Sequence, residues 1–251
     1  MYKTSNPTLK NMHNYCCGEE LADETKTASY VGVALKALLY VGLAIAAAVT
    51  AAVLLRVNTG LAGVLLALSV MGAFICSLVA SFMPATCPVS GSLYAIFEGF
   101  AVGALSALFD AVYSGIVLAA LLSTFVTFGI MMVLYATGAI RVGSRFRSFM
   151  ISALTAICVT QLLIFLVSIF FDEVYYIFYG NGIVGLLVSA AMVIFAAAFI
   201  LIDLSDVTML VDGRMEKKYE WRAAFGLSVT LIWLYMEFLR FFAIVFSRRN
   251  N

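Results

Sequence analysis

The chain has 251 residues, of which 64% are hydrophobic and only 12% are charged, and its net charge is +1. Soluble proteins carry about 25% charged residues. A soluble domain of this length could not cover itself with so few charges, so the composition indicates a membrane protein. The near-neutral charge argues against nucleic acid as a partner, because nucleic-acid-binding domains are strongly basic.

The first 29 residues are polar and mixed in charge. They lack the basic-then-apolar order of a cleaved signal peptide, so we expect residues 1–29 to form a polar N-terminal tail. This tail holds the single histidine, His13. A single histidine, placed in the polar tail, excludes an HExxH zinc site and a Ser-His protease inside the membrane. Together with the adjacent Cys16 and Cys17 it would be a poor tetrahedral zinc site.

Seven apolar segments follow, each close to the roughly 20 residues that a membrane-spanning helix needs. We therefore expect an all-α membrane protein, a bundle of seven transmembrane helices over residues 30–247 with a short tail at 248–251. The predicted spans are 31–54, 61–82, 91–109, 116–137, 149–171, 182–204 and 225–246. Asp110 and Ser114-Gly115 predict a tight hairpin between the third and fourth spans. The small-residue pairs Ala44/Ala48 and Gly99/Gly103 predict close helix packing.

The basic residues predict the orientation, because cytoplasmic loops are enriched in Lys and Arg. Of the 15 Lys and Arg residues, ten lie in the N-terminal tail and in the second, fourth and sixth loops. The other side holds Arg56, Arg248 and Arg249. The sequence thus predicts a cytoplasmic N-terminus and an external C-terminus. Lys36, near the start of the first span, is expected to extend toward the cytoplasmic side.

Three carboxylates lie inside apolar sequence: Glu98, Asp203 and Glu237. A carboxylate at membrane depth costs at least ~2.5 kcal/mol, so by default it marks a functional site. At 1.5 Å per residue, Glu98 lies about 10 Å and Glu237 about 18 Å along their spans, and Asp203 lies near the cytoplasmic end. All three therefore fall between the cytoplasmic rim and mid-membrane, and they would converge if the third, sixth and seventh spans are neighbours.

Two close carboxylates in a low dielectric share a proton. At lower pH the shared proton would hold the helices together, and at higher pH the two charges would repel and attract a cation. Calcium needs about 6–8 oxygen ligands. Because Asp203, Glu237 and Glu98 supply only part of that set, we expect weak and transient calcium binding.

Each acid also has a structural interpretation. Asp203 could cap the cytoplasmic end of its helix in water, and Asp206 could be exposed beside it. Glu237 and Arg240 are three residues apart, so they face the same side and could form an ion pair. Glu98 could be buried at a helix contact.

Several motifs follow one another along these spans. They are Ser5-Asn6-Pro7-Thr8-Leu9, Phe97-Glu98-Gly99 with Gly103, Tyr113-Ser-Gly-Ile-Val117, Tyr135-Ala-Thr-Gly138, and the block from Tyr219-Glu-Trp221 to Trp233-Leu-Tyr-Met-Glu237. In these motifs and their order, the chain resembles the bacterial branch of the Bax inhibitor-like family, known by its transmembrane Bax inhibitor motif.

The resemblance implies a seven-helix fold in which the C-terminal helix is central and the other six wrap it. It also implies a pH-sensitive calcium leak whose sensor is a carboxylate pair, matched here by Asp203 and by Glu237, where relatives carry aspartate. Relatives pair the sixth-helix acid with an arginine on an early span. The second and third spans have none, so Arg240 is the candidate charge partner.

We therefore expect a pH-sensitive cation leak, for calcium, in the bacterial inner membrane, with Glu98 and Asp206 along the ion path. It would be no enzyme and need no cofactor, and its partners would be the lipid bilayer, protons and calcium. The alternative is a non-conducting regulator of a membrane-bound protease or of envelope stress. Its contact surface would be the acidic tail cluster Glu19, Glu20, Asp23 and Glu24.

Two further classes are disfavoured. An intramembrane aspartyl protease also uses two acids to activate water, but its Gly-x-Gly-Asp signature is absent here. A light-driven retinal pump needs a lysine in its last helix, and residues 225–246 contain none.

Overall fold

A computed structural model describes residues 27–169, 180 and 182–249 of the chain. Seven helices in this part are long and apolar enough to cross a membrane. They are α2 (Tyr30–Val57), α3 (Thr59–Phe82), α4 (Cys87–Val112), α5 (Ile116–Ala136), α6 (Ser144–Ser168), α8 (Ile183–Asp212) and α9 (Glu220–Arg249). Short 3-10 turns, η1 (Pro84–Thr86) and η2 (Lys217–Tyr219), precede α4 and α9. The predicted all-α seven-helix bundle is confirmed.

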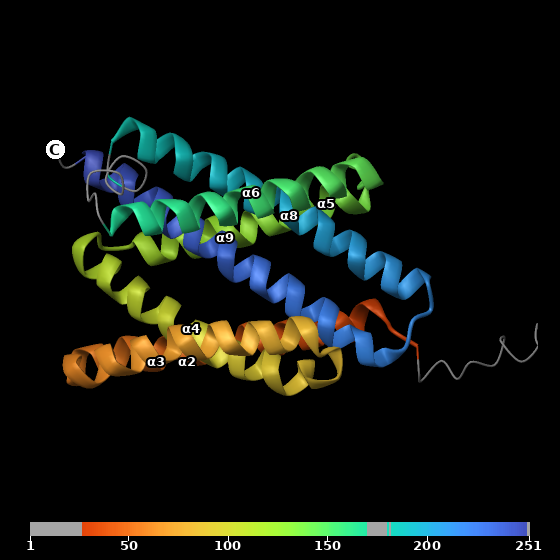
Figure 1. Ribbon diagram of the computed structural model, residues 1–251, viewed down its shortest axis with the longest axis horizontal. Coiled ribbons are helices and arrows are strands. Elements are labelled where there is room, and N and C mark those ends of the chain that lie inside the picture. Colours follow the sequence, from red (N-terminus) through yellow and green to blue (C-terminus); the bar gives the residue numbers. More distant parts are fainter. Residues whose placement is uncertain (1–26, 170–179, 181, 250–251) are drawn as a thin grey trace, which may run out of the picture.

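The last helix, α9, lies at the centre of the bundle. It packs against α2, α4, α5 and α8, while α3 lies outside on α4 and α2. Figure 1 shows α2, α3 and α4 on one side, α5, α6 and α8 on the other, and α9 crossing between them. The central position that the resemblance implied for the C-terminal helix is confirmed, and four helices form its close surroundings.

Helices α2 and α4 approach each other closely where both carry small side chains. A Cβ atom added to Gly99 would overlap the backbone of Ala44, and one added to Gly103 would overlap the backbone of Ala48. In lipid, helices associate through such van der Waals packing and not through the hydrophobic effect. The small-residue pairs found in the sequence therefore form one contact, with Gly99 and Gly103 on α4 facing Ala44 and Ala48 on α2.

The turn after α4 confirms the predicted hairpin. The backbone N–H of Gly115 donates a hydrogen bond of 3.0 Å to Oδ1 of Asp110. Gly115 has a φ of 85°, a backbone conformation that residues other than glycine rarely adopt. Asp110 thus closes the α4–α5 turn.

Two predicted features lie outside the described residues. One is the N-terminal tail up to residue 26, which includes His13, Cys16, Cys17 and the acidic cluster. The other is the end of the predicted C-terminal tail, residues 250–251. The first two residues of that predicted tail, Arg248 and Arg249, belong to α9.

A single residue, Asn58, separates α2 from α3 and caps the second of them. Its side-chain oxygen accepts a hydrogen bond of 3.0 Å from the backbone N–H of Leu61. We expect Asn58→Ala to lower the free energy of unfolding by about 1 kcal/mol, because the cap satisfies one of the free N–H groups of the first turn. Detergent unfolding monitored by circular dichroism measures this. Asn58→Asp keeps the cap, so equal losses in both variants would contradict the prediction.

Candidate functional site

Asp203 lies at the contact between α8 and α9. Its carboxylate interacts with the hydroxyl of Thr230, and its Oδ1 lies 3.7 Å from the point where a Cβ on Gly226 would stand. Gly226 thus lies next to the Asp203 carboxylate. Helix α8 continues to Asp212, and Asp203 is half-buried. The interpretation of Asp203 as a water-exposed helix cap is therefore wrong.

One oxygen of Asp203 has no partner. Oδ2 is buried and accepts no hydrogen bond. The cation whose charge reaches Asp203 is Arg147, at the start of α6, and the same guanidinium forms an ion pair with the exposed Asp206. A basic residue near Asp203 is thus Arg147 on the fifth span, which the sequence did not indicate.

Glu237 is a second carboxyl group at the α8–α9 contact, on the face of α9 toward α8. Its side chain is buried, and its Oε1 accepts a hydrogen bond of 3.1 Å from the indole N–H of Trp233. Its Oε2 is buried without a partner. The charge of Arg240 acts on Glu237, in agreement with the three-residue spacing that placed these two groups on one side of the helix.

The structure does not bring Asp203 and Glu237 together. Packing of Trp233 against Phe195 and Phe199, with ring centres 5.9 and 6.2 Å apart, fixes the register of α9 against α8. In that register Asp203 faces Gly226 and Thr230. Glu237 lies seven residues beyond Thr230, which is about 10 Å along the helix. The side chain of α9 that lies opposite Asp203 is thus the Thr230 hydroxyl and not the Glu237 carboxylate that the resemblance paired with it.

Glu98 lies on α4, which approaches a different face of α9 from α8. It follows Tyr94 by four residues on the same face of α4, and the ring of Tyr94 packs on Phe225 of α9 at 5.2 Å. Phe225 and Gly226 are neighbours in the sequence, so their side chains point about 100° apart around α9. Glu98 and Asp203 therefore lie toward different faces of α9, and Glu98, Asp203 and Glu237 do not form a common set of calcium ligands. No cluster of three or more His, Cys, Asp or Glu able to hold a metal occurs in the described residues.

Glu220 is a buried charge that the sequence pattern did not indicate. Its side chain is fully buried and forms an ion pair with Lys36 of α2. The backbone N–H of Ser29 also donates a hydrogen bond of 2.8 Å to its Oε1, and the Lys36 ammonium lies 5.2 Å from the ring centre of Trp221. Lys36 thus connects the start of α2 to the start of α9. The sequence did contain a signal for this pair: Glu220 lies at the start of the last span and Lys36 at the start of the first, and both starts were predicted on the same side of the membrane.

The motif order found in the sequence corresponds to a known family. A family model described as Bax inhibitor 1 like matches residues 6–247. The chain belongs to the Bax inhibitor 1 like family. No curated protein and no solved structure matches it. This Bax inhibitor 1 like protein is thus a membrane protein of seven helices in which Asp203 and Glu237 lie at separate points of the α8–α9 contact.

Proposed function

We propose that this protein is a pH-sensitive cation leak of the bacterial inner membrane, with calcium as the transported ion and Asp203 as the proton-sensing group. The observation that supports the proposal is the buried carboxyl oxygen of Asp203, which has no partner at the contact between two spanning helices. Such a group is stable when protonated and unfavourable when charged, unless a cation or water reaches it. The distribution of basic residues supports a cytoplasmic N-terminus.

The proposed gate follows from that chemistry. A protonated Asp203 can donate a hydrogen bond to an oxygen on α9, which keeps α8 and α9 in contact. A deprotonated Asp203 places a negative charge at this contact, which favours entry of a cation and separation of the helices. We therefore expect the flux to rise as the pH rises.

Glu237 would bind the cation at a later point along the contact between α8 and α9, which we call the α8–α9 seam. Gly226, Thr230, Trp233 and Glu237 follow one another at spacings of three and four residues, so they share the face of α9 toward α8. Between Asp203 and Glu237 the seam is filled by the rings of Trp233, Phe195 and Phe199. A cation moving along it would displace these rings, so the two carboxylates would serve in succession and would not share one proton.

The test is calcium flux into liposomes that contain the purified protein, from about pH 6 to about pH 8, a range in which a buried carboxyl group titrates. Wild type should conduct more at the upper end, and Asp203→Asn should lose this dependence because it cannot ionise. Glu216→Gln is the control, since Glu216 is an exposed carboxylate outside the α8–α9 contact, where it pairs with the exposed Lys218.

Two results would overturn the proposal. Equal pH dependence in wild type and Asp203→Asn would remove Asp203 as the sensor. No flux above that of empty liposomes at any pH would favour the non-conducting regulator of a membrane protease. The acidic contact surface suggested for that regulator lies outside the described residues, so deletion of residues 1–25 with assay of partner binding would then be the next experiment.

A further inference from the structure

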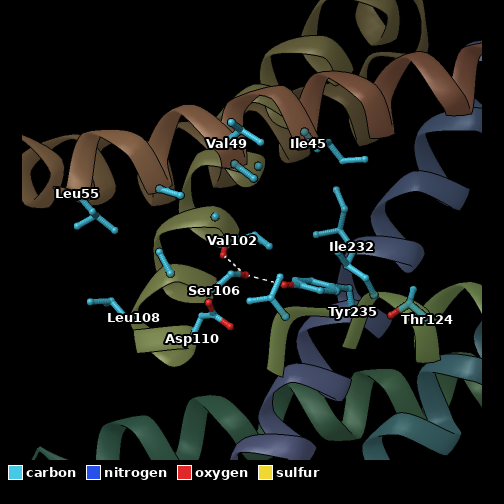
Figure 2. Close-up of a pocket in the computed structure, with 18 of the residues that line it drawn as sticks. Ile45, Val49, Leu55, Val102, Ser106, Leu108, Asp110, Thr124, Ile232 and Tyr235 are labelled. Atoms are coloured by element: carbon cyan, nitrogen blue, oxygen red, sulfur yellow. Dashed lines mark hydrogen bonds between the residues drawn. The ribbon is translucent and has the colours of Figure 1, made fainter. Parts of the chain in front are cut away.

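A cavity of about 740 Å³ lies on the side of α9 away from the α8 contact (Figure 2). Helices α2, α4, α5 and α9 line it, together with Thr59 at the start of α3. Its volume falls in the range of about 300–1,000 Å³ that is usual for ligand pockets. Along α2 the lining runs from Val41 to Arg56, which corresponds to about 22 Å. The cavity is therefore long and narrow enough for a chain-like ligand.

Most of the cavity wall presents apolar surface. Its hydroxyl groups bond to the protein itself: Ser106 and Tyr235 share a hydrogen bond of 2.7 Å, and Thr124 donates to the carbonyl of Ala120 at 2.8 Å. Figure 2 shows the Ser106–Tyr235 bond between apolar side chains such as Val102 and Ile232. A polar ligand would find few free partners here, whereas an acyl chain needs none.

The cavity also opens sideways toward the bilayer. Four of its lining side chains are 50–59% exposed on the surface of the bundle: Ile45, Val49, Leu108 and Phe125. In a membrane this part of the surface faces lipid tails. A lipid can thus insert one of its acyl chains into the cavity from the bilayer side, without crossing the bundle.

The charged lining residues of the described chain, Arg56 and Asp110, lie at one end of the cavity, where α2 and α4 both end. Arg56 forms no ion pair with a described carboxylate. Asp110 uses Oδ1 to close the hairpin, and its other oxygen can accept from a ligand. A guanidinium fits a phosphate well, and a carboxylate fits an ammonium group. One cation and one anion at a single rim therefore match a zwitterionic headgroup.

We propose that this cavity holds one acyl chain of a phospholipid with an ethanolamine headgroup, whose phosphate binds Arg56 and whose ammonium binds Asp110. Under the orientation given above, the lipid comes from the outer leaflet. The site is separate from the α8–α9 seam, and the proposal does not depend on ion conduction.

The first test uses full-length protein in detergent and phosphatidylethanolamine with a photoreactive group near the end of one acyl chain. After illumination, mass spectrometry of peptides should locate the label on α4 and α9 beside the cavity. Ala52→Phe fills the cavity and should reduce the label about tenfold, equivalent to about 1.4 kcal/mol. Val53→Phe is the matched control, because Val53 is the next residue and lies outside the lining. Equal labelling in both variants would overturn the proposal.

The second test concerns the headgroup and also applies if Ala52→Phe does not fold. Native mass spectrometry should show that wild type retains phosphatidylethanolamine better than phosphatidylglycerol, which lacks the ammonium, or diacylglycerol, which lacks the phosphate. Arg56→Gln should remove the preference over diacylglycerol, and Asp110→Asn the preference over phosphatidylglycerol. Equal retention of all three lipids by wild type would overturn the assignment.

Discussion

Replacing Gly103 with valine is expected to lower the free energy of unfolding by about 3 kcal/mol, near the upper end of the usual cost of overpacking. A side chain at this position would overlap the backbone of Ala48 on α2. Backbone atoms cannot turn away as the end of a flexible side chain can, so α2 and α4 would have to separate. Because close van der Waals contact holds helices together in lipid, that separation removes much of the interaction between these two helices.

Gly129→Val is the control for this prediction. Gly129 also lies in a spanning helix, α5, but a Cβ there would meet nothing within 4 Å. Unfolding of the purified protein by sodium dodecyl sulfate, monitored by circular dichroism, compares the two variants. A similar loss in both would show that the cost arises from helix propensity and not from the close approach of α2 and α4.

Lys36→Met is expected to lower the free energy of unfolding by about 3–5 kcal/mol, the usual cost of removing one partner of a buried ion pair. The side chain of Glu220 is 0% exposed and that of Lys36 only 15%, so the remaining carboxylate would have no water to compensate it. The pair also links the starts of the first and last spans. We therefore expect the loss to appear as earlier unfolding in the same dodecyl sulfate titration.

The double variant Lys36→Met with Glu220→Gln provides the control. Without either charge, no uncompensated carboxylate remains, so the double variant should be more stable than Lys36→Met alone. Together with Glu220→Gln alone, it completes a double-mutant cycle, in which the coupling energy is the loss in the double variant minus the sum of the two single losses. If the two single losses simply added, the ion pair would not be the cause of the destabilisation.

The sequence alone determined the fold class and the positions of the spans. Every backbone N–H and C=O group must be satisfied within the membrane, so each apolar run of about 20 residues had to form a helix. The helix ends were less well predicted. The sixth span was expected to end at residue 204, but α8 extends to Asp212, because a helix can continue beyond the apolar region once its polar end reaches water. That extension decided that Asp203 is not a terminal cap.

The sequence also identified the acids that lie at membrane depth, since their cost there follows from composition alone. It did not determine which of them meet. The register of α9 against α8 depends on how Trp233 and Leu234 pack against Phe195, Ala196 and Ile200. A shift of seven residues along one helix would exchange Thr230 for Glu237 opposite Asp203, and nothing in the local pattern distinguishes these two alternatives.

Only the tertiary structure decided the Lys36–Glu220 pair, the position of Arg147 near Asp203, and the cavity beside Arg56 and Asp110. Each of these features joins residues from helices that are distant in the sequence. Hydrophobicity and span length act on one segment at a time and depend on the local composition. Contacts between segments depend on the shapes of all the packed side chains together, and these are fixed only when the whole bundle is formed.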